Sequence, residues 1–324
     1  MSILSEIREP GQPQNLVFAR HETFHPRFGW LKKGFDRAMR DRSQASQSLT
    51  LEESTSTVNS FLAEDAPVRL GVGKNMVRSL RYWCRAFKLI DAQDQPTQFG
   101  RRLLGEEGFD PYLEDPASLW LLHWKLLEDR DDSPQQAAAW MLIFKRFART
   151  EFTPDELVEF LGQEVQRLDR KKCSESSLRK DVSCLLRMYA VQPTRKNTKG
   201  EEILDCPFTA LGLIDGAADG RQYGFRVGVK PTLPPEIIVY ACLSYAAQKE
   251  TAKTIALSAL VYTPDSPGMV FKLREEGVCE AIAHLSPTHA NLGIDNGAGK
   301  LSFFFGDDPQ GQADRILERY YSAR

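Results

Sequence analysis

The pentapeptide HETFH at residues 21–25 contains two histidines at the spacing of the zinc-protease motif H-E-x-x-H. A zinc site of that kind needs both histidines on one continuous helix, together with a third ligand further along the chain. Pro26 directly follows His25 and disfavours α-helical backbone at that histidine. The other three histidines are remote in the sequence and stand in no recognisable ligand context. The sequence therefore argues against a zinc protease.

The residues around this pentapeptide suit a different reaction, the hydrolysis of a phosphodiester. That reaction needs an activated water molecule and positive charge that stabilises the transition state, which histidine, glutamate and arginine side chains can supply. A catalytic role is therefore predicted for His21, Glu22, Arg20 and Arg27. Lys32 and Lys33 are predicted to hold phosphates together with Arg27.

A structural alternative remains open for the same stretch. In it, His21 and Glu22 anchor a turn, while Phe24, Phe28 and Trp30 pack inward. No established nuclease signature decides between the two interpretations, because the chain has neither a convincing PD-(D/E)xK pattern nor an HNH arrangement.

An acidic loop, FDPYLEDP, offers further candidate metal ligands. If the fold brings this loop to the pentapeptide, a site for Mg²⁺ or Mn²⁺ is predicted from His21, Glu22, Asp110, Glu114 and Asp115. The alternative is an ordinary acidic surface loop.

A basic helix is predicted for residues 74–90. Its positively charged residues recur at intervals of 4, 3, 4 and 3 and are Lys74, Arg78, Arg81, Arg85 and Lys88. Its apolar residues follow the same intervals and are Met76, Leu80, Trp83, Phe87 and Ile90. At ~100° per residue the two stripes lie about 160° apart. Because the segment contains no acidic residue, we expect an apolar face on the core and an unneutralised basic ridge toward solvent.

This basic ridge is predicted to contact DNA. Residues 69–102 contain eight Lys and Arg residues against two Asp residues. The predicted contacts also include Asn75, Arg101 and Arg102. The plainer alternative is a solvated helix face, but such faces usually mix charges of both signs.

The flanking residues favour a helix-turn-helix unit with a wing. Residues 56–75 supply a shorter helix and a glycine-containing turn, and residues 91–104 supply a turn, a short TQFG segment and a basic return. A helix, a turn, a recognition helix and a wing form the layout that docks in the major groove.

A second basic cluster covers residues 165–200, with ten Lys and Arg residues against three acidic ones. Its predicted DNA contacts are Arg170, Lys171 and Lys172. A mobile basic loop is the alternative. Conversely, residues 104–132 carry nine acidic residues against two basic ones, so a DNA-binding protein can still have a net charge of -2.

The predicted fold is mainly α with short β-hairpins, in which several winged-helix or helix-turn-helix units surround a central helical pair. Thr153, Pro154 and Glu156 form the start signal of one helix. Strand-like segments are YGFRVGV, MVFKL and KLSFFF. The expected divisions are a flexible arm (1–15), a first DNA-binding unit (16–105), an acidic loop with connecting helices (106–150), a second winged-helix-like unit (151–230) and a C-terminal α+β unit (231–324).

The composition is that of an ordinary globular protein, with 42% hydrophobic and 27% charged residues in 324. Six scattered cysteines without a C-x-x-C pair are expected to be reduced and mostly buried. The first residues lack a secretory h-region and no apolar run is long enough to span a membrane, so a cytoplasmic location is expected. The oligomeric state stays open, with a homodimer as one alternative.

Four stretches together resemble one bacterial family. These are FARHETFHPRFGWLKKGFD, DAPVRLGVGKNMVRSLRYWCRAFKLI, FGRRLLG and DPYLEDPASLWLLHW. They look like the SspB-like family, a formerly uncharacterised domain family encoded beside DNA phosphorothioation genes. The resemblance is strongest over residues 17–125 and covers the remainder in general layout. His25 departs from the family pattern, which further weakens the zinc-protease interpretation.

The resemblance implies a DNA nickase that gives access for sulfur modification of the DNA backbone in phage defence. It also implies a cysteine desulfurase and an ATP-dependent sulfur-transfer enzyme as partners. No catalytic set is carried over from the family. The leading hypothesis is thus a divalent-metal-dependent DNA-nicking endonuclease. The alternatives are a non-catalytic DNA-binding adaptor that recruits the modification enzymes, and a helical protein scaffold.

Overall fold

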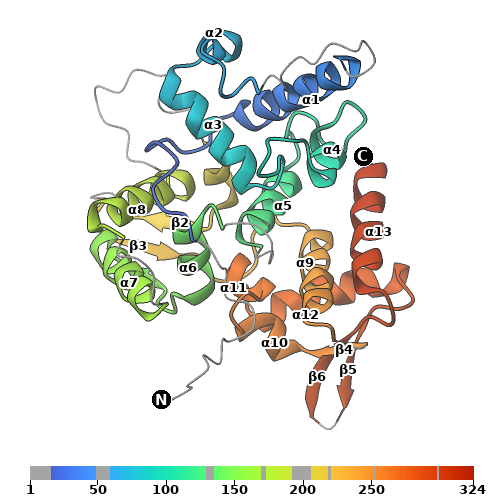
Figure 1. Cartoon of the computed structure of the whole chain (residues 1–324). Coiled ribbons are helices and arrows are strands. Elements are labelled where there is room, and N and C mark those ends of the chain that lie inside the picture. The colour runs from blue at the N-terminus through green and yellow to red at the C-terminus, as the bar shows by residue number, and fades with distance from the viewer. Residues whose placement is uncertain are drawn as a thin grey trace, which may run out of the picture.

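A computed structural model describes most of the chain, namely residues 16–48, 59–128, 135–168, 173–191, 206–217, 220–251, 253–297 and 299–324. Within these ranges the chain forms thirteen α-helices and six short strands (Figure 1). The strands make two antiparallel three-stranded sheets. The predicted mainly α fold with short β-hairpins is therefore confirmed. The predicted arm, residues 1–15, lies outside the described residues.

Helices α5 (Pro116–Leu127) and α6 (Ala138–Arg146) form the centre of the molecule. Both are apolar on nearly all sides, and every residue of α5 after its first proline is buried. Helices of this kind need protein around their whole circumference. They contact each other and also elements of the middle and the C-terminal third of the chain. Figure 1 shows the other helices arranged around them, which matches the predicted central helical pair.

The N-terminal part is a group of four helices at the top of Figure 1. They are α1 (Trp30–Ser48), α2 (Ala66–Leu70), α3 (Lys74–Ala86) and α4 (Gln98–Leu104). Helix α3 packs against both α1 and α2. Gly71 ends α2 in the left-handed conformation, with φ of 62°, which turns the chain sharply into α3.

Two predictions for this part are wrong. The basic helix was expected to reach residue 90, but it ends at Ala86, and Lys88 has a left-handed φ of 60°. The chain reverses there, because the amides of Leu89 and Ile90 both bond to the carbonyl of Cys84. The expected TQFG wing is also absent, since Thr97 caps a helix over these residues instead.

The middle part follows α6 with the order strand, helix, helix, strand, strand. The elements are β1 (Glu151–Phe152), α7 (Pro154–Arg167), α8 (Glu175–Tyr189), the 3-10 helix η2 (Pro207–Leu211), β2 (Ile214–Gly216) and β3 (Tyr223–Phe225). Thr153 and Glu156 form the predicted capping box at the start of α7. The sheet order is β1-β3-β2.

The C-terminal part begins with α9 and ends with α13. The elements are α9 (Pro235–Gln248), β4 (Thr254–Ala256), α10 (Leu257–Tyr262), α11 (Pro267–Phe271), α12 (Glu275–Leu285), the 3-10 helix η3 (Ser286–Thr288), β5 (Gly293–Gly297), β6 (Lys300–Phe304) and α13 (Pro309–Ser322). The predicted strand MVFKL is wrong. It lies largely in α11, because Ser266 and Pro267 start a short helix there.

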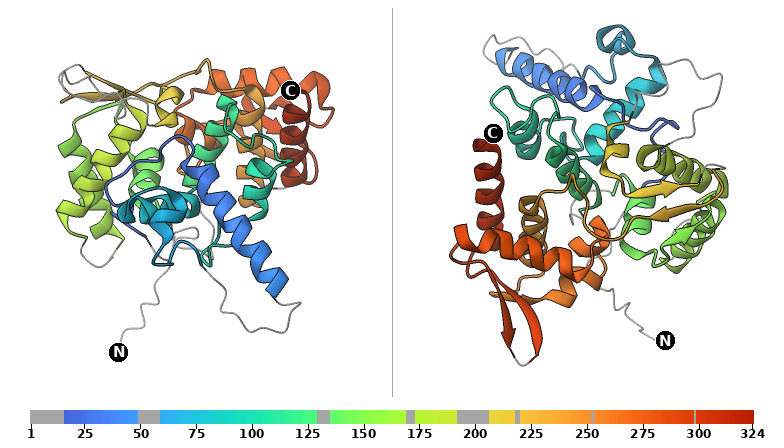
Figure 2. Two further views of the ribbon diagram at one scale, coloured as in Figure 1. Left: turned by 90° about the horizontal axis from the view of Figure 1, so that it is seen from above. Right: turned by 180° about the vertical axis from the view of Figure 1, so that it is seen from behind.

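The middle and C-terminal parts share one order of elements. In each, a strand is followed by helices and then by a hairpin, and in each sheet the last strand lies between the other two, as β1-β3-β2 and β4-β6-β5. Figure 2 shows the two parts on opposite sides of the molecule. Helices followed by a hairpin therefore occur in both parts.

The cysteines at positions 84, 184 and 242 are buried and the other three are partly buried, and none forms a disulfide. In the described ranges, no helix has both the length and the apolar character required to cross a membrane.

Candidate nucleic-acid interface

The HETFH stretch forms a turn rather than a helix, and α1 begins only at Trp30. Ala19, Glu22 and Thr23 all have positive φ values, of 54°, 51° and 66°. Such backbone is unfavourable for residues with a Cβ atom, so the surrounding contacts must hold it in place. Two histidines in this geometry do not lie on one helical face, and the argument against a zinc protease holds.

His21 is the buried anchor of this turn. Its side chain is 0% exposed, and its Nε2 lies 2.8 Å from Oδ1 of Asp181 on α8. The backbone N–H of Ala19 donates to the same carboxylate at 3.0 Å. Burial raises the pKa of Asp181, although the contact with His21 and the N–H of Ala19 oppose this. The ring of His21 also packs against Trp83 at 6.3 Å between centroids.

These contacts support the structural interpretation of His21. A side chain without solvent exposure does not reach a phosphodiester at the protein surface. Trp30 is buried as that interpretation predicted, but Phe28 is 60% exposed, so its predicted inward packing is wrong.

The same turn joins α3 to α8. The indole N–H of Trp83 on α3 donates to the carbonyl of Phe24 at 3.0 Å. On the other side, Arg187 of α8 donates to the carbonyl of Thr23 at 2.6 Å. Because Trp83 and Arg187 are 104 positions apart in the sequence, this turn fixes the relative position of two helices that are distant along the chain.

A partly exposed polar group lies on the turn that connects the two helices. Glu22 is 34% exposed, and one of its carboxylate oxygens lies 3.8 Å from Arg78, which is 57% exposed. His25 is close by, and its pKa is lowered to about 4 by burial and by the positive charges of Arg187 and Arg27. His25 is therefore neutral at pH 7 and adds no charge to this group.

The first half of α3 is open to solvent. Lys74, Asn75 and Arg78 are exposed. Gly73 precedes the helix and leaves the first N–H groups of α3 without a capping side chain. In helix-turn-helix proteins the N-terminal residues of the recognition helix contact the bases. This half of α3 has the properties that such a contact needs.

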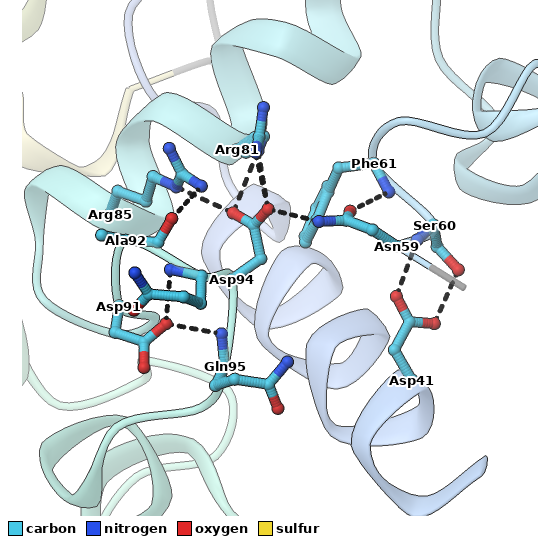
Figure 3. A network of polar contacts seen from close by, with 11 residues as sticks. Asp41, Asn59, Ser60, Phe61, Arg81, Arg85, Asp91, Ala92, Asp94 and Gln95 are labelled. Atoms are coloured by element: carbon cyan, nitrogen blue, oxygen red, sulfur yellow. Dashed lines mark hydrogen bonds and ion pairs between the residues drawn. The ribbon is translucent and has the colours of Figure 1, made fainter. Parts of the chain in front are cut away.

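The second half of α3 differs from the prediction. Asp94, which is 5% exposed, accepts hydrogen bonds from Arg81 at 2.7 Å, from Arg85 at 2.8 Å and from Asn59 at 2.6 Å. Figure 3 shows its carboxylate between the two arginines of α3 and Asn59. Burial disfavours the charged form, but these hydrogen bonds and the two positive charges hold the pKa of Asp94 below its ordinary value.

The expectation of an unneutralised ridge is therefore wrong for Arg81 and Arg85. Both are oriented by one carboxylate, with side-chain exposures of 26% and 22%. Asp94 lies outside the helix, in a turn where its own φ is 62°, which is why the helical segment alone appeared free of acidic partners. The ridge keeps a net positive charge because two arginines share one aspartate.

The remaining basic residues predicted to contact DNA have mixed surroundings. Arg101 donates to the carbonyl of Pro96, and Lys88 is half-buried. Arg102 forms ion pairs with Asp314 and Glu318 of α13. Three further candidates lie outside the described residues, namely Arg170, Lys171 and Lys172.

Lys32, Lys33 and Arg27 lie at the start of α1. Lys32 forms an ion pair with Asp36 at 2.7 Å. Lys33 is exposed and donates to the carbonyl of Leu70 at 3.1 Å. The guanidinium of Arg27 lies 5.5 Å from the ring centroid of Trp30.

The acidic loop does not form the predicted metal site. Asp110 accepts hydrogen bonds from the amides of Glu114 and Asp115, both at 2.9 Å, and from the hydroxyl of Ser118 at 2.6 Å. Asp115 caps α5 and also contacts Tyr320 and Arg324. These carboxylates therefore organise the loop itself, and their partners differ from those of His21 and Glu22. Within the described ranges, no three His, Cys, Asp or Glu side chains gather as a metal-binding group.

The two matching hairpin-containing parts differ in charge. In the middle part, α8 exposes more basic than acidic charge, and its exposed residues are Glu175, Ser176, Arg179, Lys180 and Ser183. In the C-terminal part, the corresponding helix α12 exposes Glu276 and Glu280. Arg179 and Lys180 belong to the second basic cluster, residues 165–200, which the sequence predicted as a patch that contacts the DNA backbone or as a mobile loop.

With this geometry, the comparisons define the class of the protein. The chain belongs to the DUF4007 family, described as a protein of unknown function, whose model matches residues 18–321. No curated protein sequence matches the chain.

Two solved structures are similar to this protein, the SspB crystal structure and the magnesium ion-bound SspB crystal structure. Each shares 37% sequence identity with this chain, covers 94% of it and 88% of the solved chain, and superposes with a TM-score of 0.81. The resemblance noted from the sequence is thus confirmed.

Proposed function

We propose that this protein acts in a bacterial DNA phosphorothioation system, where it binds DNA and nicks one strand in support of phage defence. The observation that carries the proposal is the similarity to SspB at 37% identity over 94% of the chain. The nicking activity comes from what the family resemblance implies, and the exposed start of α3 supports DNA binding.

The proposed duplex contact consists of Lys74, Asn75 and Arg78. They lie on the exposed N-terminal half of a helix that follows a short helix and a tight turn. Arg81 and Arg85 set the orientation of this helix through Asp94, so they act by positioning. The parts around α7–α8 and α10–α12 have the strand order expected of winged-helix units, and we propose the α8 face, with Lys180, as a second backbone contact.

The duplex contact is tested by a double charge reversal, Lys74→Glu with Arg78→Glu. If each residue neutralises about one phosphate, the slope of log K against log salt falls by about 2 and the duplex affinity drops uniformly across sequences. Lys253→Glu is the matched control, because Lys253 is 58% exposed and directly precedes β4, which lies at the opposite end of the molecule in Figure 1. Unchanged duplex affinity in the double variant rules out this contact.

The proposed cofactor is Mg²⁺ or Mn²⁺, supported by the magnesium ion-bound structure of SspB. Mg²⁺ is usually held by one or two carboxylates together with water and substrate phosphates. Glu22 fits this requirement, because it is partly exposed and lies beside Arg78 at the proposed interface. The cation would supply an activated water, while Arg78 would hold the phosphate that is cut.

The nicking activity is tested with supercoiled plasmid and the full-length protein. We expect open circles with Mg²⁺ or Mn²⁺ and none with EDTA. Glu22→Gln should abolish nicking and leave duplex affinity unchanged, whereas Glu159→Gln, on the exposed side of α7, should alter neither. Nicking that persists in Glu22→Gln places the catalytic centre elsewhere.

A non-catalytic adaptor is the second candidate function. It is favoured by the buried position of His21 and by the lack of a preassembled three-ligand group among the described residues. A protein that binds DNA tightly but yields no open circles with either cation would be this adaptor. In both cases the proposed partners are a cysteine desulfurase and an ATP-dependent sulfur-transfer enzyme, which co-elution of the purified proteins would test.

A further inference from the structure

A cationic pocket lies beside the proposed duplex contact, between α1, α2 and the acidic loop. Its volume of about 330 Å³ is at the lower end of the range for small-molecule sites. It is lined by Gly29, Lys32, Lys33, Asp36, Arg37, Arg40, Arg69, Leu70 and Tyr112. We call it the Tyr112 pocket. It adjoins the helix-turn-helix, because Leu70 ends α2 and α3 begins four residues later.

The charge of the Tyr112 pocket is positive. Five of its lining residues are Lys or Arg and one is Asp36. Two carboxylates outside the lining also pair with it, Asp41 with Arg37 at 3.1 Å and Asp65 with Arg69 at 2.6 Å. Five positive and three negative charges leave a net charge of +2.

Two of the basic side chains in the pocket have N–H groups that can donate hydrogen bonds to a ligand. Lys33 uses one of its three N–H groups on the carbonyl of Leu70, at 3.1 Å. Arg40 is exposed on α1 and forms no ion pair with a carboxylate of the described residues. A phosphate in the pocket can therefore accept hydrogen bonds from both without breaking an existing pair.

Tyr112 gives the pocket an aromatic wall. Its side chain is 72% exposed, with the ammonium of Lys32 at 5.7 Å from the ring centroid. The ring sits on a well-ordered loop, since Asp110 accepts the three hydrogen bonds described above and the amide of Leu113 donates to the carbonyl of Asp110. An exposed aromatic ring at the edge of a cationic groove is the arrangement on which unpaired bases stack.

We propose that the Tyr112 pocket binds one nucleotide of a single DNA strand. The phosphate contacts Lys33, Arg40 and Arg69, and the adjacent unpaired base stacks on Tyr112. This inference rests on the proposed function, in which the strand end left at a nick separates from its complement next to α3. It also assigns a role to the acidic loop: Asp110 is a positioning residue that holds the Tyr112 platform.

The first test measures binding of a fluorescein-labelled twelve-residue oligo-dT to the full-length protein by anisotropy. Tyr112→Ala should weaken this binding by about fivefold or more, the loss typical of removing one base-stacking aromatic ring. Tyr112→Trp should retain it. Because Tyr112 is largely exposed, neither change should alter the thermal unfolding midpoint. Wild-type affinity in Tyr112→Ala overturns the proposal.

A second readout reports the stacking directly. The chain has five tryptophans, and all are at most 5% exposed. The tryptophan of the Tyr112→Trp variant would thus be far more accessible to solvent than these. Saturating oligo-dT should quench its fluorescence, and Arg40→Glu in the same background should shift the quenching to higher oligonucleotide concentration. A signal that oligo-dT leaves unchanged overturns the proposal.

Two further arms separate this inference from its alternatives. The Lys74→Glu and Arg78→Glu double variant should lose duplex binding but keep oligo-dT quenching. If it loses neither, the duplex contact fails while the pocket stands. If dTMP displaces oligo-dT at an equal concentration, the pocket takes free nucleotides, and the assignment to a DNA strand is overturned.

Discussion

The carboxylate of Asp94 is the most informative single group to remove. Asp94→Asn keeps the size of the side chain and removes the charge that orients Arg81 and Arg85. Taking away one partner of a buried ion pair costs about 3–5 kcal/mol. Because the two arginines are 26% and 22% exposed, water compensates part of this loss. We therefore expect a loss of about 2–3 kcal/mol, at the lower end for such pairs.

Thermal unfolding followed by circular dichroism measures this loss. At ~2–4 °C per kcal/mol, the midpoint should fall by about 4–12 °C. Asp65→Asn is the matched control, because Asp65 also pairs with an arginine of its own helical unit but is 51% exposed. An exposed pair of this kind contributes about 0.2–1 kcal/mol. Its midpoint should therefore change little.

The pH dependence of the unfolding midpoint can refute the role assigned to Asp94. The folded-state pKa of Asp94 lies below its ordinary value of 3.8, so the unfolded chain takes up this proton first as the pH falls. The charged carboxylate of Asp94 stabilises the fold fully at pH values above its pKa in the unfolded chain. This stabilisation is lost as the pH falls through its pKa in the folded protein. The gap in midpoint between wild type and Asp94→Asn should thus be constant from pH 5 to 8 and narrow below pH 4. Equal unfolding midpoints for Asp94→Asn and Asp65→Asn would contradict the assigned role. A difference between wild type and Asp94→Asn that stays the same below pH 4 would also contradict it.

Further substitutions test other parts of the structure. Thr153→Ala removes the capping box of α7 and should cost about 1 kcal/mol in urea unfolding. Asp110→Asn should weaken oligo-dT binding together with stability, whereas Tyr112→Ala weakens only the binding, so the pair of variants distinguishes positioning from stacking. Burial lowers the pKa of Lys272 to about 7, so the folded protein binds fewer protons than the unfolded chain from about pH 7 to 10 and stability should rise over that range. Urea unfolding at pH 6 and pH 9 should show a smaller rise in Lys272→Met than in the control Lys249→Met.

The local signals in the sequence predicted the local structure well. The capping box at Thr153 and the apolar period of residues 74–86 gave α7 and most of α3, because both depend on residues within one or two helical turns. The end of α3 was missed, since the apolar stripe continues through Ile90 while the chain reverses to bury it. MVFKL was assigned the wrong element because a five-residue apolar run fits a buried strand and a buried helix equally well.

The surroundings of the candidate site depended on contacts that spacing does not reveal. His21 contacts Asp181, which lies 160 positions further along the chain. The residues near the pentapeptide therefore could not indicate that His21 is buried. Asp94 is only 13 positions from Arg81, but it reaches the ridge through a turn with left-handed backbone. The acidic loop was recognised as a cluster of carboxylates, whereas its hydrogen bonds turn inward and leave Tyr112 as the exposed group.

The opposite charges on α8 and α12 give the molecule an electrical polarity. Under the proposed function, a negatively charged duplex would be attracted toward Lys180 and repelled from Glu276 and Glu280, so its approach would be directed to the α8 side before contact. Steering of this kind speeds association at low ionic strength and fades as the Debye length shortens. Although the net charge of the chain is only -2, this distribution would favour, under the proposed function, an approach of DNA to the α8 side of the molecule.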